Sequence, residues 1–98
     1  MDLRFANDGL RRLAEEEGHD AGYTAGLVTK YPMRVQLIRA AEDERAFYAL
    51  KSLHFEKLKG KRSHQRSMKL NDQFRLILEI EKGSPKNTVV IVSIEDYH

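Results

Sequence analysis

Two groups of side chains in this 98-residue chain have the chemistry needed to cleave a phosphodiester. The first is a run of cations between residues 57 and 75, made of Lys57, Lys59, Lys61, Arg62, Arg66, Lys69 and Arg75. The second is the terminal sequence Asp96-Tyr97-His98. Cleaving RNA without a metal needs a base for the 2′-hydroxyl proton, cations for the phosphate and an acid for the departing 5′-oxygen. Together the two groups supply these residue types.

The charge of the chain is concentrated in its centre. Residues 51–75 hold eight Lys/Arg and two Asp/Glu, a local charge of +6, whereas residues 1–50 and 76–98 each carry −2. Such a patch attracts polyanions even when the net charge is small. Two simpler interpretations stay open: a solvated face of Lys and Arg, and a frayed C-terminal Tyr-His.

Periodicity predicts the elements that position these side chains. Residues 2–6 alternate polar and apolar, which predicts a short strand, and Asn7 and Asp8 are both suited to cap a helix that ends near Gly18. Pro32 lies either in the first turn of a second helix or inside a longer, kinked one. That helix carries an apolar stripe made of Leu27, Val28, Tyr31, Val35, Ile38 and Ala41. Over residues 42–55 the pattern predicts the end of a helix, followed by an irregular segment that packs against the core as it crosses the fold.

Beyond Gly60 the pattern becomes strand-like. Strands are predicted around residues 67–70, 74–81 and 89–94, separated by turn residues at Asn71-Asp72 and over 82–87. They form an antiparallel meander. The whole chain then reads β-α-α-β-β-β, an α+β fold in which an antiparallel sheet carries two helices on one face.

Strand parity predicts where the cations point. If the apolar residues of the 74–81 strand face the helices, Arg75 lies on the opposite face of the sheet, together with Ser67 and Lys69. The loop of residues 57–62 approaches that face. The sequence therefore predicts a concave cationic surface, with the last three residues of the chain emerging from the neighbouring strand.

Composition narrows the class of protein. The length predicts a single domain over residues 1–98, and no apolar run is long enough to span a bilayer. The chain has no cysteine, and its four His show neither an i,i+4 pair nor a His-x-His spacing, so we expect no metal site and no cofactor. A reducing cytoplasm is compatible with this composition.

Several motifs with fixed spacing resemble the HigB-like branch of the RelE/ParE toxin superfamily. They are Leu58-Lys59-Gly60-Lys61-Arg62, then Gln65 and Ser67, then Asn71-Asp72-Gln73-Phe74-Arg75, and the terminal Ile94-Glu95-Asp96-Tyr97-His98. The family pattern has L-K-G, N-D-Q-W-R and a terminal D-Y-H at these places. The chain departs from that pattern at Lys61, which replaces an acid, at His64, which replaces a glycine, and at Phe74, which replaces Trp.

This resemblance implies a toxin of a type II toxin–antitoxin system with a RelE-like fold. Its implied activity is that of a ribosome-dependent mRNA endoribonuclease, an mRNA interferase, which arrests translation by metal-independent acid–base cleavage. Its implied partners are mRNA, the ribosome and a HigA-like antitoxin with a helix-turn-helix domain. Operator DNA would be reached only through that antitoxin, and the toxin would act in the cytoplasm.

The resemblance also implies catalytic roles for individual residues. Lys59 and Arg75 would contact the phosphate, while Tyr97 and His98 would position the base and transfer protons. Asp96 would orient His98 or act as a base itself. The other cations expected to bind RNA or phosphate are Lys57, Lys61, Arg62 and Lys69.

Two competing functions stay open at the level of sequence. ParE-like relatives share the fold but inhibit DNA gyrase without cleavage, and an RNA-binding or ribosome-binding module would have no turnover. The terminal D-Y-H favours the enzyme. His54 is either a packed histidine or a member of the site.

Overall fold

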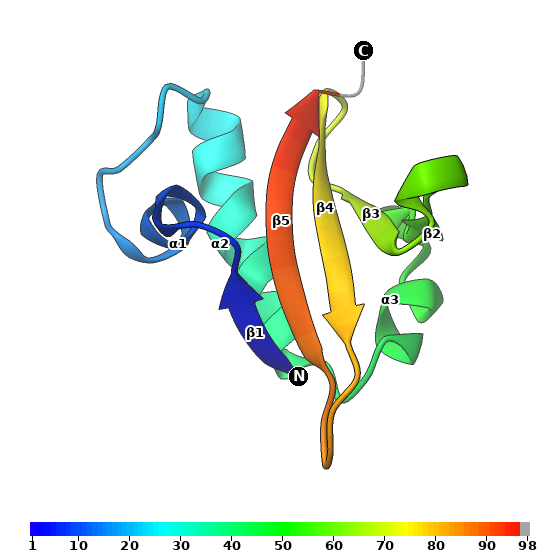
Figure 1. Cartoon of the computed structure of the whole chain (residues 1–98). Helices are drawn as coiled ribbons and strands as arrows, with labels where there is room; N and C mark the ends of the chain where they lie inside the picture. Colours follow the sequence, from blue (N-terminus) through cyan, green and yellow to red (C-terminus); the bar gives the residue numbers. More distant parts are fainter. Residues whose placement is uncertain (97–98) are drawn as a thin grey trace.

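The computed structural model describes residues 1–96 and contains a five-stranded sheet with the strand order β1-β5-β4-β3-β2 (Figure 1). The strands are Asp2–Phe5 (β1), Glu56–Lys57 (β2), Gln65–Lys69 (β3), Phe74–Glu81 (β4) and Thr88–Asp96 (β5). Strands β2 to β5 pair antiparallel, whereas β1 pairs with β5 in parallel. The expected α+β fold is confirmed, and the structure adds the parallel N-terminal pairing and the short edge strand β2.

Helices α1 (Asp8–Glu15) and α2 (Ala25–Ala40) pack on one face of this sheet (Figure 1). Asn7 caps α1 as expected, because its Oδ1 accepts a hydrogen bond of 3.0 Å from the backbone N–H of Leu10. Pro32 lies inside α2, so the longer of the two helices allowed by the sequence is the one that forms. The region expected to be irregular contains a short helix, α3 (Arg45–Ala49), and a 3₁₀ turn, η1 (Lys51–Leu53).

The core lies between α2 and the sheet. Leu27, Tyr31, Val35 and Ile38 of the predicted apolar stripe are buried on α2. They belong to one cluster with the inward-facing residues of β4 and β5, which are Leu76, Leu78, Val89 and Ile91. This cluster holds one face of the sheet closed, so a ligand must approach the other face. None of the helices within residues 1–96 is long and apolar enough to cross a bilayer.

Strand β5 contains one extra residue relative to β4. Ile77 pairs with Ser93, but its neighbour Leu78 pairs with Ile91, so Val92 forms a bulge. Because of the bulge, Ile91 and Ile94 both face the core although they are three residues apart. Beyond it, Glu95 lies directly opposite Arg75 on the far face of the sheet.

The parity predicted for the cations is confirmed. Lys69 pairs with Arg75 and Ser67 pairs with Ile77, which places these four side chains on the face away from α1 and α2. Ile77 is nevertheless 3% exposed, because the segment between β2 and β3 folds over it. This overhang turns the open face into a hollow.

Candidate active site

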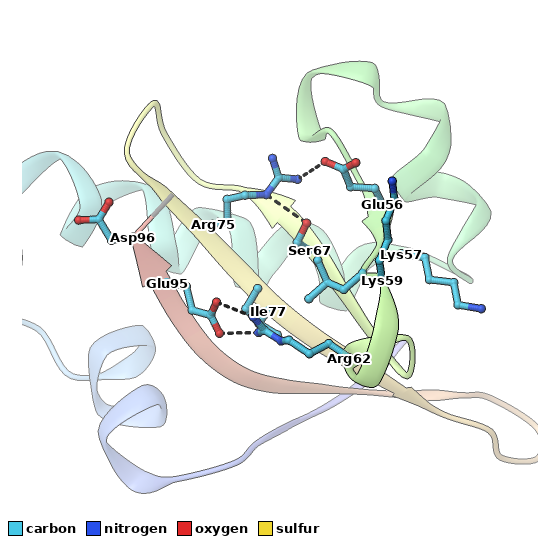
Figure 2. Close-up of a pocket in the computed structure, with 10 residues that line it drawn as sticks. Glu56, Lys57, Lys59, Arg62, Ser67, Arg75, Ile77, Glu95 and Asp96 are labelled. Atoms are coloured by element: carbon cyan, nitrogen blue, oxygen red, sulfur yellow. Dashed lines mark hydrogen bonds and ion pairs between the residues drawn. The ribbon is translucent and has the colours of Figure 1, made fainter. Parts of the chain in front are cut away.

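The hollow on the open face is a cavity of about 340 Å³, which we call the cup (Figure 2). Its floor is formed by β3 and β4, one wall by β2 and the turn that follows, and the other wall by the end of β5. The residues that line the cup are Glu56, Lys57, Leu58, Lys59, Arg62, Ser67, Arg75, Ile77, Glu95 and Asp96.

Arg75 is the most firmly held cation of the cup. The residue is only 9% exposed, and its Nε donates a 3.1 Å hydrogen bond to Oγ of Ser67. Its Nη2 donates to the carbonyl oxygen of His54 at 2.5 Å and lies 3.2 Å from Oε1 of Glu56. These contacts come from two separate segments, β3 and residues 54–56, so they fix the plane of the guanidinium before any ligand arrives.

His54 contributes its backbone to the site. It follows η1 in a left-handed conformation, with φ of 46°, and in this conformation its carbonyl oxygen accepts the hydrogen bond from Arg75. His54 lines a second cavity, which it shares with Arg75, and does not line the cup.

Arg62 faces the cup from the opposite wall and is paired with Glu95 (Figure 2). Its Nη1 and Nη2 donate to the two carboxylate oxygens of Glu95 at 3.1 and 2.6 Å, a bidentate pair. Hydrogen bonding to Arg62, and then its positive charge, lower the pKa of Glu95 below its usual range. The same pairing raises the pKa of Arg62.

Lys57 and Lys59 line the cup and are exposed. Lys59 immediately precedes the 3₁₀ turn η2 (Gly60–Arg62). Gly60 has φ of +65°, a conformation that strains any residue with a Cβ, so the glycine is needed for this turn. The conformation at Lys59-Gly60 therefore determines the position of Arg62 over the sheet.

Two of the predicted cations lie outside the cup. Lys61 is not among the residues that line it, and Lys69 borders the second cavity, where its Nζ lies 3.3 Å from Oδ1 of Asp72. Lys69 pairs with Arg75 in the ladder as predicted, and Arg75 lines both cavities, whereas Lys69 does not line the cup. The predicted cationic surface is thus divided between two adjoining cavities.

Of the terminal residues, Asp96 is described, and Tyr97 and His98 lie outside the described residues. Asp96 borders the cup at the end of β5 and pairs in register with Phe74, one position beyond the pair of Arg75 and Glu95. Gln73 Nε2 donates a 3.1 Å hydrogen bond to its Oδ2, and Figure 2 shows the carboxylate pointing away from Arg75.

Glu56 and Glu95 were not predicted as site residues. With Asp96 they place three carboxylates beside the four cations that line the cup. Glu95 could not be placed from sequence, because the bulge at Val92 changes the parity of everything after it. Glu56 lies on a strand of two residues, too short to show any alternation. Within residues 1–96 no group of three His, Asp or Glu side chains is arranged to hold a metal ion.

With this geometry in place, comparison with known families gives a match over residues 3–98. The matching family is described as the HigB-like toxin, the RelE-like toxin of a type II toxin–antitoxin system. The chain belongs to this family. Membership implies that the toxin has a cognate antitoxin as its partner. No curated protein sequence matches the toxin.

Three solved structures share the fold of this toxin at low sequence identity. A YoeB/ParE toxin from Agrobacterium tumefaciens aligns with a TM-score of 0.64 and 15% identity, over 100% of both chains. The conserved hypothetical protein HP0894 from Helicobacter pylori has a TM-score of 0.55 and 11% identity, over 99% of this chain and 94% of its own. YafQ from E. coli strain BL21(DE3) has a TM-score of 0.54 and 13% identity, over 98% and 92%. These neighbours establish the RelE-like architecture.

Proposed function

We propose that this HigB-like toxin is a ribosome-dependent mRNA endoribonuclease that arrests translation. Its family supports the proposal, and so does a cup whose size and charge suit a sugar–phosphate link. In the proposed reaction the 2′-hydroxyl attacks the neighbouring phosphate while a base removes its proton. An acid then protonates the departing 5′-oxygen, and no metal takes part.

One observation carries this proposal: Arg75 is fixed on the floor of the cup by hydrogen bonds to Ser67 and to the His54 carbonyl. A cation that is already oriented where negative charge develops stabilises a transition state without reorganisation. Lys59 is placed to neutralise the same phosphate from the rim. A merely solvated Lys/Arg face would not need an arginine that is 9% exposed.

The remaining roles in this proposal follow the family. Tyr97 and His98 position the base and transfer protons, and Asp96 orients His98 or serves as a base. The other cations, which bind RNA at the rim or beyond it, are Lys57, Lys61, Arg62 and Lys69. The proposed partners are mRNA, the ribosome and a helix-turn-helix antitoxin that alone contacts operator DNA, all in the cytoplasm.

Expression of the toxin in bacteria, with mapping of RNA 5′ ends, tests this function. We expect growth arrest together with new ends inside translated frames. Arg75→Ala should reduce cleavage about 10²–10³-fold, as for loss of one preorganised donor. His98→Ala should also abolish arrest. Lys86→Ala, in the loop between β4 and β5, is the matched control and should stay toxic.

The folded state of both inactive variants is checked by circular dichroism, so that loss of structure is not mistaken for loss of chemistry. Arrest with intact mRNA and broken DNA would instead identify a gyrase inhibitor of the ParE type. Arrest by folded His98→Ala, with mRNA still cut at the wild-type rate, would refute the assignment of proton transfer to that residue.

A further inference from the structure

The cup is one end of a longer groove. A second cavity of about 250 Å³ lies beside it and shares Arg75 as a common wall. A third cavity of about 390 Å³ shares Lys69, Asn71 and Asp72 with the second. The three hollows therefore follow one another from the cup, around the turn between β3 and β4, to helix α2.

The far part of this groove is built by three segments that are distant in sequence, namely α2, η1 and the end of β3 with the turn that follows it. It is lined by Lys30, Arg34, Ser52, Lys69, Asn71 and Asp72, which we call the basic extension. The turn between β3 and β4 lies at the same end of the molecule as the first turns of α2 (Figure 1). Side chains from the helix and the sheet thus meet at one surface.

Two contacts give the basic extension a defined framework. Nη1 of Arg34 donates a 2.6 Å hydrogen bond to the carbonyl oxygen of Lys69, which ties α2 to the end of β3. Oδ1 of Asn71 accepts from the backbone N–H groups of Gln73 and Phe74 at 2.9 and 2.7 Å, which fixes the turn. The surface therefore has a defined shape before any ligand binds.

The charge of the basic extension is positive. Lys30, Arg34 and Lys69 face a single lining acid, Asp72. Asp72 is fully exposed and lies 3.3 Å from Nζ of Lys69, and an exposed ion pair of this kind contributes little to stability. A ligand with several phosphates can therefore displace Asp72 and recruit all three cations.

We propose that the basic extension binds the single-stranded RNA backbone that continues from the link held in the cup. The path crosses Arg75, follows Lys69 and ends at Lys30 and Arg34. This inference rests on the proposed function, since the cup must hold RNA for the strand to continue from it. It assigns to the toxin a substrate contact several nucleotides long.

Uncleavable 2′-O-methyl oligouridines of three and six nucleotides test the path with the ¹⁵N-labelled full chain. We expect the trinucleotide to shift amide resonances of the cup only, and the hexanucleotide to add those of Lys30, Arg34 and Asn71. Shifts confined to the cup at both lengths would overturn the extension and leave the proposed function standing. If neither oligonucleotide shifts any amide resonance of the cup, the result would count against the proposed function itself.

Salt dependence tests the charge of the extension separately. Each phosphate contact on a single strand contributes about 0.7 to the slope of log affinity against log salt. Lys30→Gln, an exposed position on α2, should lower the hexanucleotide slope by about that amount and leave the trinucleotide slope unchanged. Lys86→Gln removes the same charge from the loop at the opposite end of the molecule (Figure 1) and should change neither slope.

Two results of these experiments would overturn the proposal. The first is a hexanucleotide slope that is the same for Lys30→Gln and the wild type. The second concerns the antitoxin as a competing polyanion: if the purified antitoxin shifts the amides of the basic extension and the hexanucleotide does not, the surface binds protein rather than RNA.

Discussion

Arg75 and Arg62 both face a carboxylate, but they are held very differently. Arg75 is buried and anchored by Ser67 and the backbone of His54, whereas the Arg62 side chain is 47% exposed. In the proposed reaction Arg75 is therefore the fixed contact of the phosphate. Arg62 must release Glu95 before it can bind another anion, because its Nη1 and Nη2 already donate to the two carboxylate oxygens of Glu95 in the free protein.

Glu95→Gln tests this pair through the pH dependence of stability. The folded-state pKa of Glu95 is lowered, mainly by its hydrogen bonds from Arg62, so its contribution is present above the unfolded pKa of about 4.5. That contribution is lost as the pH falls through the lowered folded value. We expect the variant to be less stable than the wild type near neutral pH, by at most about 1 kcal/mol because the pair is partly solvated.

Urea unfolding of both proteins between pH 3 and pH 7 measures the effect, which should shrink toward acid pH. Glu17→Gln, an exposed carboxylate after α1, controls for the general loss of one negative charge. A difference between wild type and Glu95→Gln that is independent of pH would show that the ion pair does not stabilise the fold.

At the scale of elements, a buried hydroxyl connects the two helices of the covering layer. Tyr31 on α2 is fully buried, and its hydroxyl donates a 2.9 Å hydrogen bond to the carbonyl oxygen of Leu10 on α1. Burial raises the pKa of Tyr31, so this group stays protonated and remains a donor. Tyr31→Phe should lower the free energy of unfolding by about 1–3 kcal/mol, since it leaves a buried carbonyl without this partner.

Denaturant unfolding of Tyr31→Phe measures that loss. The cup lies on the other face of the sheet, so cleavage by the folded variant should equal that of the wild type. A variant as stable as the wild type would mean that water replaces the hydroxyl at Leu10. Val28→Ala, a half-buried position on the same helix, gives the cost of trimming α2 without removing a hydrogen bond.

The elements differ in how far the sequence determines them. The N-cap of α1, the apolar stripe of α2 and the strands β3 and β4 follow from local patterns and all form, although β3 spans Gln65–Lys69 rather than the predicted 67–70. The bulge at Val92 was not predicted, because a continuous run of β-branched residues has the same hydrophobic pattern in every register. Pro32 left two helix lengths open, since packing of Leu27 and Tyr31 decides where α2 begins.

The same distinction holds for the candidate site. Parity placed Arg75, Ser67 and Lys69 on one face correctly, because β3 and β4 alternate regularly. The pairing of Arg75 with Glu56 depends on how residues 54–57 cross the sheet, and no local pattern encodes that crossing. Tertiary contacts therefore determine which acids reach the cup.

At the scale of the whole molecule, the charges are unevenly distributed along the chain. The central +6 segment supplies four cations of the cup and Lys69 of the basic extension, while the flanking segments are mildly acidic. In the proposed function the ribosome presents mRNA to this surface in a fixed orientation. The toxin alone lacks that positioning.

We therefore expect the isolated toxin to cut a naked mRNA at least about 10²-fold more slowly than the same mRNA on translating ribosomes, since misplacement of a reacting group costs on that order. Initial rates by primer extension, with and without ribosomes, measure the ratio. Equal rates would overturn ribosome dependence while leaving the endoribonuclease activity itself intact. His98→Ala serves as the inactive reference in both settings.

Strand β2 has a consequence for how the protein behaves in a crowded solution. It is the outer strand of the sheet beside the cup, and it is only two residues long, Glu56 and Lys57, both charged and exposed. Short charged borders of this kind resist edge-to-edge joining of sheets from different molecules. This strand beside the cup is thus also the feature that discourages self-association, and lengthening it with neutral β-branched residues should promote aggregation.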